Sequence, residues 1–312
     1  MSDIMVSIFV PTYNHENYIV QALDSILMQK TQYTYEVFVG EDCSTDNTRQ
    51  VLKAWEKAHP GKFTILYREE NMNKKKIYNS LDLKLRCKGK YIIGLEGDDF
   101  WTDPMKLEKQ VTFLENHPEY YAVSHNCIVV GADSEANSED YPECKDTEYT
   151  LRHFASEVMP GQLTTLLSRN YMTDEGFDKE LLFIPYGPGD RKLYFSIAAQ
   201  GRIYCMQETM SAYRHITSGG SSFSATYVRN YEKEVQYLYD RMTYAQKLDN
   251  REALYCARVQ YLVNLRNALR HKQAEPAAIF AAAKKVPHWY TYLPVMLKRD
   301  VNRVILHKVP NF

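Results

Sequence analysis

The chain has 312 residues, 45% of them hydrophobic, and a formal net charge of −1 at pH 7. This length suits one large domain or a domain with a smaller appendage, and the near-zero charge excludes a whole-molecule attraction to nucleic acid. The six cysteines are scattered without a C-x-x-C pair, which disfavours a disulfide framework or zinc site and favours a cytoplasmic location. The N-terminus shows no signal-peptide pattern, and no apolar run reaches the roughly 18 residues of a membrane-spanning helix.

The first 120 residues alternate between two kinds of pattern. Runs of β-branched and aromatic residues predict strands, and apolar residues at helical spacing predict helices between them. The predicted strands cover residues 5–14, 35–42, 62–71 and 90–99, and the predicted helices cover 16–29, 44–60, 78–89 and a segment that Asp103 caps and Pro104 begins. Strands that alternate with crossover helices are typical of an open α/β fold, with a mainly parallel sheet flanked by helices.

The pattern changes after residue 120. Residues 121–131 predict one more strand, and the polar, acidic residues 132–150 predict a surface loop. Long amphipathic patterns over 226–248 and 251–271 predict a helical C-terminal extension. The tail, residues 284–308, mixes aromatic residues and leucines with basic residues against a single acid. Two interpretations of the tail stay open: a helical cap on the core, or a peripheral contact with an anionic membrane surface.

Polar clusters follow three of the predicted strands, namely PTYN at residues 11–14, GEDCSTD at 40–46 and EGDD at 96–99. Parallel strands present their carboxyl ends at one edge of a sheet, where ligands bind. Three clusters that converge on this edge therefore predict a site. Crowded carboxylates repel one another, and a divalent cation such as Mg²⁺ or Mn²⁺, which also binds phosphates, would neutralise that repulsion.

Of the three acids in EGDD, Asp98 is the best candidate for a direct metal ligand. Glu96 and Asp99 would bind through water or orient other groups, although Asp99, like Asp103, could instead cap the next helix. Lys74 begins a basic run that could meet phosphate charge or lie on a solvated loop. No G-x-x-x-x-G-K-[ST] loop is present, and no G-x-G-x-x-G follows the first strand, which disfavours P-loop hydrolysis and dinucleotide binding.

Three stretches together resemble the N-terminal half of family 2 glycosyltransferases, the GT-A group of inverting enzymes: VSIFVPTYNHENYIVQALDSILMQ, VFVGEDCSTDNT and GKYIIGLEGDDFW. The resemblance is dense over residues 4–120 and returns in pieces up to 222. It implies a nucleotide-sugar donor, most often a UDP-sugar, with Mn²⁺ or Mg²⁺. It also implies a GT-A domain over 1–222, with a nucleotide-sugar half (1–120) and an acceptor half (121–222), followed by a helical region over 223–312.

Donor-binding roles are expected for residues in the three motifs and near them, for Lys74 from its charge alone and for the others from the resemblance. These residues are Pro11, Thr12, Tyr13, Glu41, Asp42, Lys74, Glu96, Asp98 and Arg214. By matching motif, the first three would line the nucleoside pocket, Asp42 would bond the base and Glu41 would lie toward the ribose. Asp98 would hold the metal on the diphosphate. The triplet here begins with Glu96, where the family often has aspartate, which weakens Glu96 as a direct contact.

An inverting transfer needs a base on the acceptor hydroxyl. In PGDRKLYFSIAAQG the resemblance assigns this base to Asp190, with Gly189 where the family often has glutamate. From spacing alone, an acid that opens a helix is more often a cap. In MSAYRHITSGGSS, Arg214 would screen phosphate and His215 would reach the metal or diphosphate, although a lone histidine is more often structural.

The expected activity is a metal-assisted single displacement from a nucleotide-sugar to a hydroxyl of a glycan or lipid-linked glycan, in surface polysaccharide biosynthesis. Two alternatives stay open. A sugar nucleotidyltransferase would share the sheet and the cation, but it usually carries a glycine-rich phosphate loop that PTYNHENY lacks. A non-catalytic nucleotide-sugar-binding module would keep the pocket and need no base. The expected location is cytoplasmic, with peripheral contact at the inner face of the membrane left open.

Overall fold

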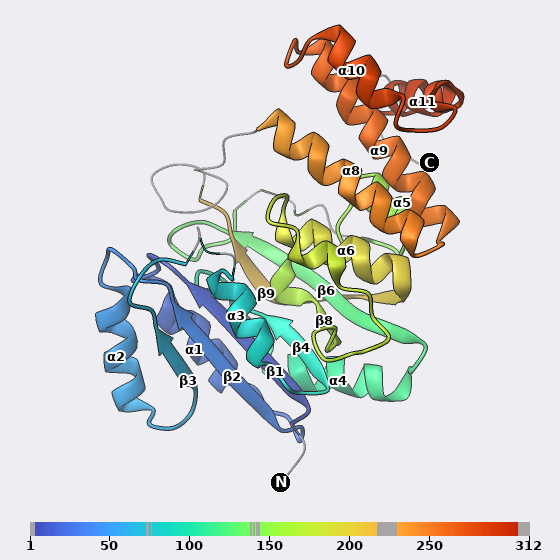
Figure 1. Ribbon diagram of the computed structural model, residues 1–312. Coiled ribbons are helices and arrows are strands. Elements are labelled where there is room, and N and C mark those ends of the chain that lie inside the picture. Colours follow the sequence, from blue (N-terminus) through green and yellow to red (C-terminus); the bar gives the residue numbers. More distant parts are fainter. Residues whose placement is uncertain are drawn as a thin grey trace. The chain divides into compact units, whose positions relative to one another are not determined.

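A computed structural model describes residues 4–72, 75, 77–137, 139, 141, 144–216 and 230–304, the last six of these by their backbone alone. The chain divides into two compact units (Figure 1). Unit 1 comprises Met1–Glu148, Pro160–Phe177 and Arg202–Tyr227, and unit 2 comprises Tyr149–Met159, Asp178–Gly201 and Val228–Phe312. The predicted border between residues 222 and 223 lies outside the described residues. Two segments that the sequence assigned to the first domain group instead with the C-terminal helices.

Unit 1 is built on one mixed sheet. Its strands are β1 (Val6–Thr12), β2 (Tyr35–Glu41), β3 (Thr64–Tyr67), β4 (Tyr91–Gly94), β5 (Phe100–Trp101), β6 (Tyr120–Val130), β8 (Leu167–Arg169) and β9 (Arg202–Arg214), and β7 (Glu148–Tyr149) lies where the chain leaves the unit. The order is β3-β2-β1-β4-β8-β6-β9-β5. The first four strands are parallel, as predicted, and β6 is parallel to β9. The short strands β8 and β5 pair antiparallel with their neighbours.

The helices of unit 1 follow the predicted order. They are α1 (Ile19–Leu27), α2 (Thr48–Ala58), α3 (Asn79–Arg86), α4 (Lys106–Asn116) and the single turn η1 (Leu163–Thr165). Helix α4 begins later than predicted, because Asp103 and Pro104 form the turn before it. The Asp103 side chain accepts a hydrogen bond from the backbone N–H of Met105 at 2.8 Å, which closes that turn.

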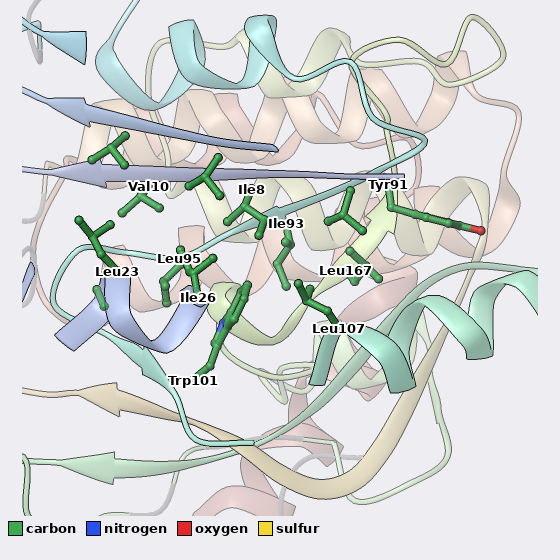
Figure 2. Close-up of a cluster of buried hydrophobic side chains, with 14 of the residues drawn as sticks. Ile8, Val10, Leu23, Ile26, Tyr91, Ile93, Leu95, Trp101, Leu107 and Leu167 are labelled. Atoms are coloured by element: carbon green, nitrogen blue, oxygen red, sulfur yellow. The ribbon is translucent and has the colours of Figure 1, made fainter. Parts of the chain in front are cut away.

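The hydrophobic core of unit 1 lies between the central strands and the helices α1 and α4 (Figure 2). Ile8 on β1 pairs in register with Ile93 on β4, and both are fully buried or nearly so. Leu95 is also fully buried and ends the apolar run directly before the acidic residues. Burying such side chains stabilises the fold by roughly 1.5–3 kcal/mol each, so the strand ends that carry the polar clusters are held on a rigid base.

One charged side chain lies inside this core. Lys106, the first residue of α4, is fully buried, and its Nζ donates a hydrogen bond to Gln110 Oε1 at 2.7 Å. The same nitrogen lies 4.2 Å from the ring centroid of Trp101. Burial disfavours the charged form and lowers the pKa of Lys106 well below its usual value. The unfolded chain therefore binds a proton more tightly than the native protein at this position.

Because the pKa of Lys106 is lowered in the native state, stability is expected to rise with pH until the unfolded lysine also loses its proton near pH ~10.4. One such group contributes a slope of up to about 1.4 kcal/mol per pH unit. Lys106→Met should remove this contribution and flatten the pH dependence. Urea unfolding of both proteins between pH 6 and pH 10 measures the difference. Lys57→Met, at an exposed position of α2, is the matched control. A constant difference between Lys106→Met and wild type across pH would contradict the prediction.

Unit 2 is helical where it is described. Its elements are α5 (Leu151–Ala155), η2 (Glu180–Phe183), α6 (Gly189–Gln200), α8 (Tyr231–Lys247), α9 (Arg251–Arg270), α10 (Pro276–Ala283), η3 (Trp289–Tyr292) and α11 (Leu293–Val304). The side chains of Asn230 and Asn250 cap α8 and α9, each accepting a backbone N–H at 3.0 Å. The predicted helical C-terminal region is confirmed. Among the described residues, no helix has the length and apolar content needed to cross a membrane.

Candidate functional site

The carboxyl ends of β1, β2 and β4 meet at one edge of the unit 1 sheet. Strand β1 is parallel to both β2 and β4. The backbone continues these pairings past the strands, because Asp42 N donates to Thr12 O at 3.0 Å and Gly97 N donates to Pro11 O at 3.1 Å. The predicted convergence of the three polar clusters is therefore confirmed. Thr12 is buried at this edge, whereas Pro11 and Tyr13 are partly exposed.

The loop after β1 is hydrogen-bonded to the loop after β2. Asn14 has a positive φ of 57°, a conformation that asparagine tolerates. Its backbone N–H donates to Ser44 Oγ at 3.0 Å, and its Oδ1 accepts a hydrogen bond from the backbone N–H of Thr45 at 2.8 Å. These hydrogen bonds fix the two loops against each other at the carboxyl ends of β1 and β2.

Glu41 and Asp42 have different surroundings. Glu41 is fully buried, and its two carboxylate oxygens accept hydrogen bonds from Ser44 N at 2.6 Å and Arg49 Nε at 2.5 Å. Asp42 is 3% exposed and accepts a hydrogen bond from Met72 N at 2.8 Å. Burial raises the pKa of Asp42, against the opposing effects of the Met72 N–H and the Arg68 cation. Glu41 therefore shapes the loop through protein contacts, and its predicted contact with the ribose stays a prediction.

The end of β3 belongs to the same edge, although no site residue was predicted there. Arg68 follows β3, and its guanidinium donates to Asn79 Oδ1 at 3.1 Å and to Asp82 Oδ2 at 2.6 Å. Asn71 Nδ2 donates to the backbone oxygen of Asp42 at 3.1 Å. The signal that could have found these residues is the polar run REEN after a strand pattern, of the same kind as the other three clusters.

An open groove of about 470 Å³ lies along this end of β3. Its lining residues are Tyr67, Arg68, Glu69, Glu70, Met72, Lys75 and Ile77. Lys75 pairs with Glu70, with Nζ 2.6 Å from Oε1. Lys74, which was predicted to meet phosphate, lies outside the described residues. The groove borders Asp42 through Met72 and therefore extends the surface of the candidate site.

The three carboxylates of the acidic segment after β4 differ in burial and in hydrogen-bond partners. Asp99 is 1% exposed and accepts hydrogen bonds from Thr164 Oγ1 and Arg214 N, both at 2.8 Å. Burial, together with the nearby charges of Asp98 and Glu96, raises the pKa of Asp99 well above its usual value. Asp99 therefore ties the segment to η1 and β9, and the alternative of a helix cap is wrong.

Of the two neighbouring aspartates, Asp98 has the more solvent-accessible carboxylate. Its side chain is 18% exposed, and its Oδ2 lies 3.7 Å from Nε2 of His15. Glu96 Oε2 accepts a long hydrogen bond of 3.4 Å from Gln162 Nε2. Carboxylate oxygens at a strand end, with Glu96 and Asp98 both partly exposed, fit Mg²⁺ or Mn²⁺, which binds a few protein oxygens together with phosphate and water.

The Arg214 guanidinium fixes the backbone of the acidic segment after β4. It donates to the backbone oxygens of Asp98 at 2.8 Å and Gly131 at 2.6 Å. It also donates to Gln21 Oε1 and Ser134 Oγ, both at 3.0 Å, and lies over the ring of Tyr18. These contacts give Arg214 a positioning role. Its predicted contact with phosphate stays a prediction.

His215 lies beyond the end of β9. Its Nδ1 lies 2.5 Å from Glu139 Oε2, and its ring stacks on that of Tyr213. Among the described residues, the structure pairs His215 with Glu139 and gives it no contact with Asp98. Its predicted place on the metal therefore stays a prediction.

Asp190 lies in unit 2, in the first turn of α6. Its side chain is partly exposed, and Oδ1 accepts a hydrogen bond from Arg191 N at 2.7 Å. The preceding turn is shaped by Gly187, whose φ is +81° and where a Cβ would lie 2.6 Å from the ring of Tyr237. Only glycine fits at position 187, so the segment that presents Asp190 has a defined conformation.

Comparisons with known proteins agree on one family. The sequence profile described as glycosyl transferase family 2 matches residues 7–169. An uncharacterized protein of Mycobacterium tuberculosis is 31% identical over 220 residues, which are 69% of this chain and 60% of that protein. The putative teichuronic acid biosynthesis glycosyltransferase TuaG of Bacillus subtilis is 36% identical over 111 residues, which are 35% of this chain and 42% of that protein.

A solved structure agrees on the fold. Staphylococcus aureus TarS in complex with UDP-GlcNAc superposes with a TM-score of 0.56 at 19% identity, over 96% of this chain and 73% of that one. At that identity the likeness concerns the fold alone. The chain spans 60% of the length of the mycobacterial relative and 42% of TuaG. The profile covers half of the chain, including all three polar strand ends. The chain belongs to glycosyl transferase family 2.

Proposed function

We propose that this chain transfers a sugar, with inversion, from a nucleoside diphosphate sugar to a hydroxyl group of a glycan or a lipid-linked glycan. The observation that carries the proposal is the sheet edge where buried Asp42 follows β2 and partly exposed Asp98 follows β4, on either side of the parallel strand β1. Asp42 offers hydrogen-bonding groups to a base, and Asp98 offers oxygens for a cation on a diphosphate.

Asp98 is the residue that would hold Mn²⁺ or Mg²⁺, with Glu96 beside it. The cation, when bound, would act as a Lewis acid and offset the charge on the departing diphosphate. The protein groups around it have separate tasks. Asp99, Thr164 and Arg214 hold the backbone of the acidic segment in place, so that the oxygens of Asp98 are positioned before the donor binds. Preorganisation of this kind avoids a reorganisation cost during the reaction.

Asp190 is the proposed base toward the acceptor. Its carboxylate accepts the proton of the acceptor hydroxyl while that oxygen attacks the anomeric carbon, opposite the leaving diphosphate. The name of the relative TuaG refers to teichuronic acid biosynthesis, which supports a surface polysaccharide as the acceptor. A cytoplasmic site of action is part of the proposal.

The donor class can be tested by ligand-dependent stability. UDP with Mn²⁺ is expected to raise the thermal unfolding midpoint more than GDP or dTDP with Mn²⁺, and more than UDP alone. A ligand at some tens of its Kd stabilises the native state by roughly 2 kcal/mol, which corresponds to a shift of a few degrees in a protein of this size. Thermal-shift measurements with each nucleotide, with and without Mn²⁺, test this. A larger shift with GDP or dTDP would contradict UDP as the nucleotide.

We also propose a peripheral membrane contact in the C-terminal region. Large apolar side chains of this region are exposed, namely Phe280 (53%), Tyr290 (56%), Leu293 (43%) and Leu297 (62%). Lys284 and Lys285, which directly follow α10, and Lys298 on α11 are also exposed. Exposed apolar side chains beside lysines match the chemistry of an anionic lipid surface.

Flotation with liposomes tests this contact. Lys284→Glu together with Lys285→Glu is expected to reduce binding to phosphatidylserine liposomes at least tenfold, since each basic residue near such a surface contributes about 1 kcal/mol. Neutral phosphatidylcholine liposomes should bind both proteins weakly. Lys57→Glu with Lys62→Glu, at exposed positions of unit 1, keeps the change in net charge the same and controls for it. Equal losses in both double variants would rule out a local role for α10 and α11.

A further inference from the structure

His15 is a residue at the sheet edge to which the proposed function gives no task. Its backbone is fixed independently of its ring. The N–H donates to Thr48 Oγ1 at 2.8 Å, and the carbonyl accepts from Ile19 N at 2.9 Å at the start of α1. These hydrogen bonds do not involve the imidazole, so the loop and the first turn of α1 should keep their shape when the ring is replaced.

The imidazole lies between the first loop and the acidic segment. Nδ1 is 3.2 Å from Thr12 Oγ1, and Nε2 is 3.7 Å from Asp98 Oδ2. The ring also packs on Gly97, where a Cβ would come within 2.8 Å of Nδ1 and 2.7 Å of Thr12 Oγ1. Glycine at position 97 thus leaves the space that Thr12 and His15 occupy beside Asp98.

This arrangement sets which atom faces the carboxylate. Thr12 is 2% exposed, so its hydroxyl needs a partner within the protein. When that hydroxyl donates to Nδ1, the neutral ring carries its proton on Nε2, which is the nitrogen that faces Asp98. The distance of 3.7 Å is longer than a hydrogen bond. A small rotation of the Asp98 side chain would bring Oδ2 into hydrogen-bonding range.

We infer that His15 is a positioning residue for Asp98, which turns the carboxylate toward a divalent cation and couples the first loop to the acidic segment. The inference rests on the proposed function, because that proposal places the cation on Asp98. A neighbouring group that orients a ligand contributes about 10- to 100-fold to metal affinity. In this tautomer the ring does not bind the cation, because Nε2 carries a proton and has no free lone pair.

The experiment measures Mn²⁺ binding to the full chain by the electron paramagnetic resonance signal of free Mn²⁺, with UDP present at a fixed concentration. His15→Ala and His15→Asn are expected to raise the Kd of Mn²⁺ about tenfold. His15→Gln should stay within about threefold of wild type, because its amide NH₂ reaches the position of Nε2, whereas the shorter asparagine reaches only that of Nδ1. His117→Asn, at an exposed histidine of the same unit, is the matched control.

The outcomes separate this inference from the proposal beneath it. If Asp98→Asn abolishes Mn²⁺ binding while His15→Ala binds Mn²⁺ like wild type, the role of His15 is overturned and the metal site stands. If Asp98→Asn binds Mn²⁺ like wild type, Mn²⁺ binding does not depend on Asp98, and both the inference and the proposed metal site are overturned. Thermal unfolding midpoints are compared throughout. Equal weakening by His15→Gln and His15→Ala would mean that packing, not the Nε2–H group, is what Asp98 needs, and would also overturn the inference.

Discussion

Asp190→Asn is expected to reduce sugar transfer by about 10²- to 10⁴-fold, the range that a positioned general base contributes. The substitution keeps the shape of the side chain and an oxygen that can accept the N–H of Arg191, so the first turn of α6 should stay intact. Since Asp190 has no proposed contact with the donor, binding of UDP with Mn²⁺ should be unchanged. Initial rates with saturating donor, together with the donor-dependent shift in unfolding temperature, measure both effects.

The control for this prediction is Asp249→Asn, at an exposed position of the same unit where φ is 51° and asparagine is well tolerated. It should transfer sugar at the wild-type rate. Full activity in Asp190→Asn would assign the base elsewhere. Loss of donor binding together with activity would mean that Asp190 holds the donor or the fold. A wild-type protein that binds donor and transfers nothing to any acceptor would favour the binding-module alternative.

The strand ends could be predicted from the sequence because the signals are local. Each apolar run that stops at a polar cluster, such as Tyr91 to Leu95 before Glu96, identifies both a strand and its carboxyl end. Parallel topology then brings those ends to one edge without any knowledge of side-chain contacts. Strand β3 carries the same local signal, because its apolar run also ends in a polar stretch that contains Arg68 and Asn71.

The remaining features depend on contacts between residues far apart in the chain. Asp99 accepts hydrogen bonds from Thr164 and Arg214, which lie 65 and 115 positions away. The sequence near Asp99 does not indicate these two partners or the burial of its side chain. Strand β8 has only three residues, too few for a period-two pattern to predict it, and its place between β4 and β6 follows from tertiary pairing. The different surroundings of the two aspartates are therefore a property of the folded chain.

Substitutions of the two neighbouring aspartates should have different effects on Mn²⁺ binding. Asp98→Asn is expected to weaken Mn²⁺ binding at least 100-fold in the presence of UDP, because an amide replaces the solvent-accessible carboxylate that is proposed to bind the cation. Transfer should fall by a similar factor. Asp99→Asn should keep Mn²⁺ binding within about threefold, since its side chain faces Thr164 and the N–H of Arg214, and an amide can meet both.

The measurement is a titration of free Mn²⁺, with thermal unfolding as a check on folding. Asp98 is partly exposed, so its replacement should leave the unfolding midpoint near that of wild type. Asp99 is buried at the junction of η1 and β9, so its replacement is the one expected to change stability. Replacement of Asp99 should therefore change mainly the stability, and replacement of Asp98 mainly the affinity for Mn²⁺. If Asp99→Asn lost Mn²⁺ and Asp98→Asn kept it, the proposed metal ligand would be the wrong aspartate, and the solvent exposure of a carboxylate would not predict its role at this strand end.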